Sequence, residues 1–203
     1  ANVDGIGGYK IGFELGLGFG LPAVVAAARK HTDKPIIYDH QKAGTDIPDL
    51  GKDYANDMKS YGVDAIIIFP ESGPETQRAW TEAAQATGLV VLIGGEMTHK
   101  GYKRSEGGYI ADEALEEMYS NGADQGVIDF VVPGNRLDRI RFYKELIENK
   151  GISPVFYAPG FVAQGGEISE AARILDSWHA IVGRGIYAAD NIRKAAEELT
   201  SQL

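Results

Sequence analysis

Short runs rich in β-branched and aromatic residues alternate with stretches of helical periodicity along this chain. The runs occupy residues 9–15, 35–41, 64–70, 89–96, 125–133, 153–160 and 180–186. Within one of them, residues 65–69 read Ala-Ile-Ile-Ile-Phe, an unbroken apolar stretch typical of a parallel strand covered by helices on both faces. Strands and helices alternating at about 25 to 35 residues per unit predict an α/β fold.

Two of the intervening stretches carry clear helix boundaries. Pro74 stands at the start of the stretch 75–87, and Gly88 follows it. The stretch 136–150 is followed by Gly151. Proline early and glycine late are the expected ends of helices, so both stretches are predicted to be helical.

The repeat length fits either a (β/α)8 barrel or an open doubly wound sheet. Polar and glycine residues gather directly after the strands, at 39–46, 96–101, 160–166 and 183–184. A barrel brings all such strand ends to one face, which favours a single (β/α)8 TIM-barrel domain over residues 1–203.

A closed barrel of this type needs eight strands, whereas the pattern yields seven. Residues 1–8 are too short and glycine-rich to form another strand and helix. Either the first βα unit is missing from this chain or the sheet stays open between its first and last strands. We favour the missing unit.

Composition narrows the partners that this domain could have. The chain has 20 basic and 29 acidic residues, a net charge of -9, which disfavours nucleic acid and anionic membranes as partners. It contains no cysteine, which excludes disulfides and thiolate chemistry. No apolar run approaches the roughly 20 residues of a membrane span, and no signal segment opens the chain, so we expect a cytoplasmic protein.

Two glycine-rich segments indicate an anion-binding site. Residues 158–167 read Ala-Pro-Gly-Phe-Val-Ala-Gln-Gly-Gly-Glu, and residues 182–187 read Val-Gly-Arg-Gly-Ile-Tyr. Backbone N–H groups can approach a phosphate closely where no Cβ intervenes, and Arg184 could add a bidentate partner. Each loop alone would be read as a turn with a solvated arginine, but two at adjacent strand ends favour phosphate binding.

Lys10 lies within an otherwise apolar strand, where an unpaired ammonium group would be costly. A carboxylate should therefore lie near it, and Asp39 and Asp46 are the candidates. An alternating array of lysine and aspartate could hold a proton donor beside a developing carbanion. It could equally be a structural ion-pair network at the barrel mouth.

These motifs resemble, in type and order, those of the orotidine 5'-phosphate decarboxylase family. They are Lys10-Ile11-Gly12, Asp39…Lys42…Asp46-Ile47-Pro48, Gly95-Glu96-Met97-Thr98-His99, Pro159-Gly160-Phe161-Val162-Ala163-Gln164-Gly165-Gly166 and Val182-Gly183-Arg184-Gly185-Ile186-Tyr187. The resemblance covers nearly the whole chain. It implies a homodimeric (β/α)8 barrel that converts orotidine monophosphate to UMP without a metal or an organic cofactor.

The resemblance also implies roles for individual residues. Lys10 looks like the lysine that contacts the ribose, Asp39 like the aspartate against the substrate carboxylate, and Lys42 like the lysine that protonates C6. Asp46 resembles the aspartate that crosses to the partner's site, and Thr98 stands where a serine reads the pyrimidine edge. Gln164 and Arg184, with the Gly183 amide, look like the groups that hold the phosphate. The remaining substrate-binding positions are Pro159, Gly160, Gly165 and Gly166.

The spacing Asp-x-x-Lys-x-x-x-Asp is longer than the Asp-x-Lys-x-x-Asp of the family. Asp39 and Lys42 would fall on opposite faces of a regular strand, so a bulge or an early strand end is required. Two other readings remain open. One is a related sugar-phosphate barrel of the hexulose-phosphate synthase or keto-gulonate-phosphate decarboxylase type, which needs magnesium. The other is a non-catalytic nucleotide-phosphate-binding relative.

Overall fold

The computed structural model describes residues 3–40, 45–161 and 168–202. Its strands are β1 Tyr9–Gly12, β2 Ile36–Asp39, β3 Ala65–Ile68, β4 Val90–Gly94, β5 Asp129–Val131, β6 Val155–Pro159 and β7 Trp178–Ile181. Its α-helices are α1 Phe13–Phe19, α2 Leu21–Arg29, α3 Gly51–Ser60, α4 Pro74–Ala86, α5 Asp112–Asp124, α6 Leu137–Glu148, α7 Ile168–Ala171, α8 Arg184–Tyr187 and α9 Ile192–Thr200. Two short 3-10 helices, η2 Pro48–Leu50 and η3 Arg104–Glu106, lie in the connections.

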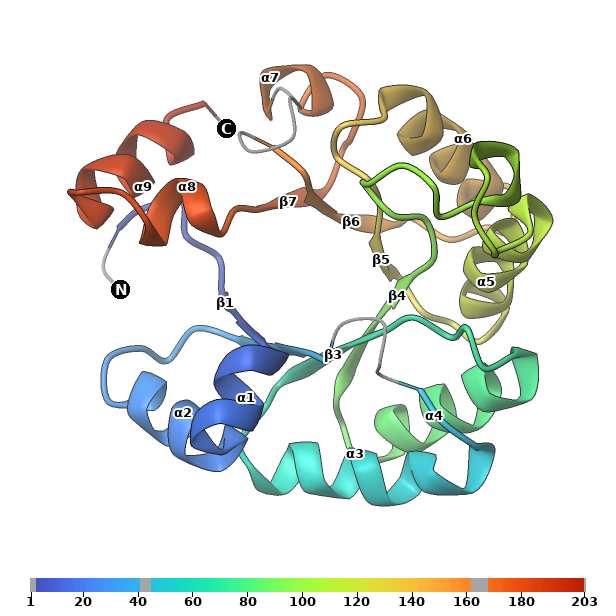
Figure 1. Cartoon of the computed structure of the whole chain (residues 1–203), viewed down its shortest axis with the longest axis horizontal. Helices are drawn as coiled ribbons and strands as arrows, with labels where there is room; N and C mark the ends of the chain where they lie inside the picture. The colour runs from blue at the N-terminus through green and yellow to red at the C-terminus, as the bar shows by residue number, and fades with distance from the viewer. Residues whose placement is uncertain (1–2, 41–44, 162–167, 203) are drawn as a thin grey trace.

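The strands form one parallel sheet in the order in which they occur along the chain. The sheet curls around a central axis, and the helices lie outside it (Figure 1). This is the arrangement of a TIM barrel with seven strands in the described residues instead of eight, as expected for a barrel that lacks its first unit.

Two hydrophobic cores hold the curled sheet together. The larger core lies between sheet and helices and includes Ile66, Ile93 and Phe130. The smaller core fills the inside of the curl and is built from Ala65, Ile67, Phe69, Leu92 and Val131. Alternate residues of a strand point to opposite faces of the sheet, so those of β3 pack into one core and the other in turn. β3 is therefore buried throughout, as its unbroken apolar run predicts.

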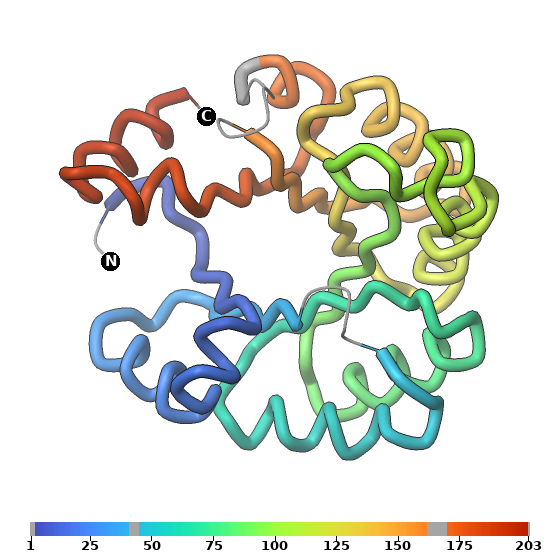
Figure 2. Tube along the Cα trace, viewed as in Figure 1, coloured from blue at the N-terminus to red at the C-terminus, as the bar shows by residue number. Residues whose placement is uncertain are grey.

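β1 and β7 form the two edges of the sheet. Residues 3–8 contain no strand or helix and approach the opposite edge of the sheet on their way to β1. A Cβ at Gly5 would lie 2.8 Å from Thr200 Cβ, and one at Gly7 would lie 3.4 Å from His179 Nδ1. The start of the described chain therefore runs beside α9 and β7, as the blue and red traces show (Figure 2).

The predicted helix boundaries are confirmed to within one or two residues for α4 and α6. Several strand predictions were too long; the run 125–133, for example, contains only the strand Asp129–Val131. The run 9–15 gives only the strand Tyr9–Gly12, because residues 13–19 turn into α1. The run 180–186 begins two residues late, since β7 starts at Trp178, and its last residues, 184–186, lie in α8.

No helix among the described residues has both the length and the apolar character needed to cross a membrane.

Close packing between α3 and α4 requires a glycine at position 51. A Cβ there would lie 2.9 Å from Trp80 Cα and 2.7 Å from Trp80 Cδ1, closer than real contacts allow. Trp80 is itself fixed, because its Nε1 donates to the carbonyl of Ile47 at 3.0 Å. The two helices can meet at this distance only without a side chain at position 51.

We expect Gly51→Ala to lower the free energy of unfolding by about 1–3 kcal/mol, the usual cost of overpacking. Gly18→Ala is the matched control, because Gly18 is helical and a Cβ added there would meet nothing within 4 Å. Urea denaturation of the two variants measures the difference. Equal stabilities would show that the α3–α4 contact adjusts without cost.

Candidate active site

The carboxyl ends of the strands form the mouth of the barrel, where Lys10 and Asp39 lie close together. Lys10 lies on β1 and Asp39 is the last residue of β2, and Lys10 Nζ is 2.7 Å from Asp39 Oδ2. The Asp39 side chain is 9% exposed and that of Lys10 is 26% exposed, so the carboxylate is buried whereas the lysine remains accessible to solvent. This contact is the one that the lysine in an apolar strand predicts.

β2 ends at Asp39, two residues earlier than the sequence run suggests. The spacing between Asp39 and Lys42 requires a bulge or an early strand end, and between these two residues the structure describes only His40, which is not part of a strand. Lys42 itself lies outside the described residues.

Asp46 does not join the pair of Lys10 and Asp39. Its side chain is exposed, and its Oδ1 accepts a hydrogen bond from the backbone N–H of Ile47 at 2.8 Å. Its carbonyl accepts from Thr76 Oγ1 at 2.9 Å, which ties the segment to α4. Within the described ranges no lysine or arginine forms an ion pair with Asp46.

The predicted phosphate-binding residues lie at the ends of β6 and β7. Pro159 ends β6, and Gly160 follows with a φ of 108°, a conformation that favours glycine. Gly183 and Arg184 connect β7 to α8, and both are exposed. In the part of the chain that the structure describes, no carboxylate pairs with Arg184. Gln164, Gly165 and Gly166 lie outside the described residues.

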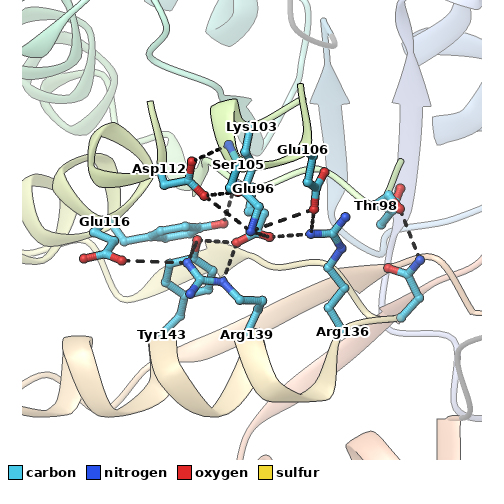
Figure 3. Close-up of polar contacts among 12 residues, drawn as sticks. Glu96, Thr98, Lys103, Ser105, Glu106, Asp112, Glu116, Arg136, Arg139 and Tyr143 are labelled. Carbon is cyan, nitrogen blue, oxygen red and sulfur yellow. Dashed lines mark hydrogen bonds and ion pairs between the residues drawn. The ribbon is translucent and has the colours of Figure 1, made fainter. Parts of the chain in front are cut away.

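Thr98 follows β4 and is half-buried. Its carbonyl oxygen accepts a hydrogen bond from Asn135 Nδ2 at 3.2 Å, which joins the loop after β4 to the turn after β5. Two residues before Thr98, the Glu96 side chain is completely buried. Figure 3 shows this carboxylate surrounded by groups from the loop and from α6.

Glu96 binds three cationic side chains and a hydroxyl group. Its Oε1 lies 2.8 Å from Arg136 Nη1 and 3.0 Å from Lys103 Nζ. Its Oε2 lies 2.7 Å from Arg139 Nε and accepts a hydrogen bond from Tyr143 at 2.6 Å. Burial alone would raise the pKa of the Glu96 carboxyl, but the hydrogen bonds from Tyr143, Arg139 and Lys103 outweigh it and lower that pKa.

A second buried hydroxyl fixes the backbone at the same strand end. Tyr119 OH accepts from the N–H groups of Gly95 and Glu96, each at 3.1 Å, and donates to the carbonyl of Val131 at 2.7 Å. A Cβ at Gly95 would lie 2.9 Å from the Tyr119 ring, so glycine is needed for this approach. The ends of β4 and β5 are thereby held in one position.

Another titratable group, which the sequence did not indicate, lies inside the curl. Asp129 at the start of β5 is hydrogen-bonded to Tyr157 of β6, whose ring centroid is 4.9 Å from that of His179 on β7. Burial raises the pKa of Asp129, and the hydrogen bond from Tyr157 and the charge of His179 oppose that rise. These side chains belong to the inward-facing register of the sheet, since Val131 pairs with Tyr157 and Tyr157 with His179.

Residues 2–199 match the orotidine 5'-phosphate decarboxylase / HUMPS family. This chain belongs to that family.

Its relatives include proteins named orotidine 5'-phosphate decarboxylase, a carboxy-lyase. That of Methanocaldococcus jannaschii is 31% identical over 202 residues, which cover 98% of this chain and 88% of the relative. That of Methanosphaera stadtmanae is 28% identical over 198 residues, covering 96% of this chain and 84% of the relative.

Solved structures agree with the family assignment. The M. jannaschii orotidine 5'-monophosphate decarboxylase complexed with the inhibitor BMP matches with a TM-score of 0.82 at 26% identity. The match covers 97% of this chain and 86% of that one. Leishmania donovani UMP synthase, at 20% identity and a TM-score of 0.76, shares the fold over 45% of its length.

For this family member, the sequence motifs located Thr98 but gave no role to Glu96 and its partners on α6. A signal for them is nevertheless present in the sequence. Glu96 is a carboxylate that ends an apolar run, and Arg136, Arg139 and Tyr143 recur at helical spacing on one face of α6. What the sequence does not give is which helix face meets which strand end.

Proposed function

We propose that this chain decarboxylates orotidine 5'-phosphate to UMP in pyrimidine biosynthesis. The observation that carries the proposal is the 2.7 Å contact between Lys10 and the buried Asp39 carboxylate at the barrel mouth, in a chain of this family. Lys10 and Asp39 would be two of the four residues of the lysine and aspartate array that the reaction needs.

Phosphate and base would be held at two separated parts of the mouth. Arg184 and the backbone N–H of Gly183 would bind the phosphate, together with the loop from Pro159 and Gly160 onward. Thr98 would hydrogen-bond the pyrimidine edge. Binding energy from the phosphate, remote from C6, can be used to align the base with the reacting groups.

The chemical step would run through Lys42, with Lys10, Asp39 and Asp46 completing the array. The bond between C6 and the carboxylate breaks, CO2 leaves, and the electron pair remains on C6. The Lys42 ammonium group donates its proton to C6, which yields UMP and a neutral amine. A positioned ammonium stabilises charge that exists only in the transition state, whereas Asp39 beside the substrate carboxylate disfavours the ground state.

Lys42→Ala should lower kcat for orotidine 5'-phosphate by about 100-fold or more, because the variant loses its proton donor. Its affinity for UMP should change little by comparison. Absorbance loss of the substrate gives kcat, and calorimetric titration gives the affinity. Lys52→Ala, an exposed lysine on α3, is the control that should retain wild-type values.

Two outcomes would contradict the proposed activity. Wild-type protein that binds UMP tightly but shows no turnover would indicate a nucleotide-phosphate-binding relative. Activity on a sugar phosphate that disappears with a chelator, with none on orotidine 5'-phosphate, would indicate the magnesium-dependent sugar-phosphate reaction.

Arg184→Ala should weaken UMP binding by about 10- to 100-fold, the cost of removing a charged hydrogen-bonding partner of the phosphate. Uridine, which has no phosphate, should bind the variant and the wild type equally. Arg193→Ala on α9, whose side chain is 66% exposed, provides the arginine control. An unchanged affinity for UMP would place the phosphate elsewhere.

We infer in addition that the functional form is a homodimer to which Asp46 contributes across the interface. The four large apolar residues of α1 are all exposed: Phe13 at 39%, Leu15 at 47%, Leu17 at 69% and Phe19 at 73%. Ile47 and Leu50, which follow the exposed Asp46 on the next segment of the mouth, are exposed at 56% and 41%. Apolar surface next to a carboxylate that forms no ion pair within the described chain supports burial against a second copy of this chain.

Phe19→Asp should convert the dimer to a monomer and lower turnover, because the partner's Asp46 is then withdrawn from the site. Analytical ultracentrifugation measures the oligomeric state and the substrate assay measures turnover. Ile192→Asp, an apolar residue on α9 that is 55% exposed, is the matched control. A fully active monomer, or a dimer unaffected by Phe19→Asp, would refute this interface.

A further inference from the structure

The Glu96 carboxylate ties the loop after β4 to another part of the fold. Of its partners, Lys103 lies within the loop, whereas Arg136 directly precedes α6 and Arg139 and Tyr143 lie on that helix. The loop and the helix therefore share one buried anion (Figure 3). Moving either would separate the cations from a fully buried carboxylate, where the interaction between charges is stronger than in water.

Three further carboxylates balance the cations around Glu96. Glu106 lies 2.6 Å from Arg136 Nη1, Asp112 lies 3.8 Å from Lys103 Nζ, and Glu116 lies 3.9 Å from Arg139 Nη2. Arg136 Nη1 thus contacts two carboxylates, Glu96 near the start of the loop and Glu106 further along it. The ion pairs involve residues near both ends of the loop, so the position of the loop does not depend on a single ion pair.

Stability alone does not account for such a network. Burying one anion with three cations carries a large desolvation cost, and apolar residues of the same volume would often stabilise the fold as well. What a buried and fully paired charge supplies is one fixed geometry, because every alternative arrangement leaves a charge unpaired.

The residue that this geometry fixes is Thr98. Glu96 and Lys103 hold the loop on both sides of Thr98, and Asn135, next to Arg136, hydrogen-bonds its carbonyl at 3.2 Å. Met97, between Glu96 and Thr98, packs into the core inside the curl. The backbone of Thr98 is therefore held from the outside by charge and from the inside by apolar contact.

We propose that Glu96 is a positioning residue that holds Thr98 at the pyrimidine base of the nucleotide. This inference rests on the proposed function, in which Thr98 reads the base edge. No described contact of the network reaches Gly183 or Arg184, which lie at the other side of the mouth, so phosphate binding is independent of it. Glu96 thus governs recognition of the base and not of the phosphate.

The experiment compares UMP with ribose 5-phosphate, which has the same sugar and the same phosphate ester but no base. In Glu96→Gln, the affinity for UMP and kcat/KM for orotidine 5'-phosphate should fall by about 10- to 100-fold, as expected for a misplacement of about 1 Å. The affinity for ribose 5-phosphate should stay at the wild-type value. Calorimetric titration of both ligands gives the ratio of affinities that decides the question.

A second variant acts on Thr98 with less effect on the fold. Asn135→Ala removes only the side chain that binds the Thr98 carbonyl. It should lower the affinity for UMP, relative to that for ribose 5-phosphate, by a smaller factor than Glu96→Gln does. Asp176→Asn is the control, since it breaks the 2.6 Å ion pair with Lys144 where Asp176 is 86% exposed. That variant should bind both ligands as the wild type does.

Equal losses for UMP and ribose 5-phosphate in Glu96→Gln would overturn the proposal, because they would show a general structural role. Unchanged affinities for both ligands in Glu96→Gln and Asn135→Ala would overturn it as well. Failure of the proposed function looks different, because the wild-type protein itself would then show no turnover of orotidine 5'-phosphate and no preference for UMP over ribose 5-phosphate.

Discussion

Parallel pairing of the strands is the constraint on which the rest of this structure depends. Each strand from β1 to β7 runs in the same direction as its neighbour, so all carboxyl ends open onto one face. In the observed register, Lys10 pairs with Ile37 and Gly12 with Asp39, so the Lys10 and Asp39 side chains belong to the same inward-facing set. The Lys10 side chain is therefore long enough to bring its ammonium group to 2.7 Å from the Asp39 carboxylate.

The distribution of charge at the mouth is compatible with the anionic ligand that the proposed function requires of this acidic protein. The net charge of the chain is -9, and around Glu96 three cations lie among four carboxylates, so the two signs largely cancel there. Lys10 is balanced by Asp39. Arg184 is exposed and, over the residues that the structure describes, meets no carboxylate. In the proposed function, Arg184 would therefore offer a phosphate a local positive charge although the chain as a whole is acidic.

In the proposed function, recognition of the base and recognition of the phosphate would rest on different physical means. The loop that carries Thr98 is held by a buried charge network, which admits one geometry. The proposed phosphate site at Gly160 and Gly183 would rely on backbone that carries no Cβ. Rigid placement suits the planar edge of a base, whereas close backbone approach suits the spherical charge of a phosphate.

The sequence by itself determined the fold class, the approximate position of each strand and the residues of the mouth. These follow from local patterns: an apolar run such as 65–69 must be buried on both faces, and Lys10 in an apolar strand must find a carboxylate. The end of β2 at Asp39 and the helix at 184–187 were not readable, because apolar residues at a strand end suit a strand and a short helix equally.

Only the tertiary structure decided which carboxylate Lys10 contacts and what Glu96 does. Asp39 and Asp46 are chemically the same group a few residues apart, and the register of β1 against β2 selects Asp39. Glu96 is separated by about 40 residues from Arg136 and Arg139, so the docking of α6 against the end of β4 creates its site. Contacts between distant segments depend on how the elements pack, and packing is a property of the whole fold that no local pattern records.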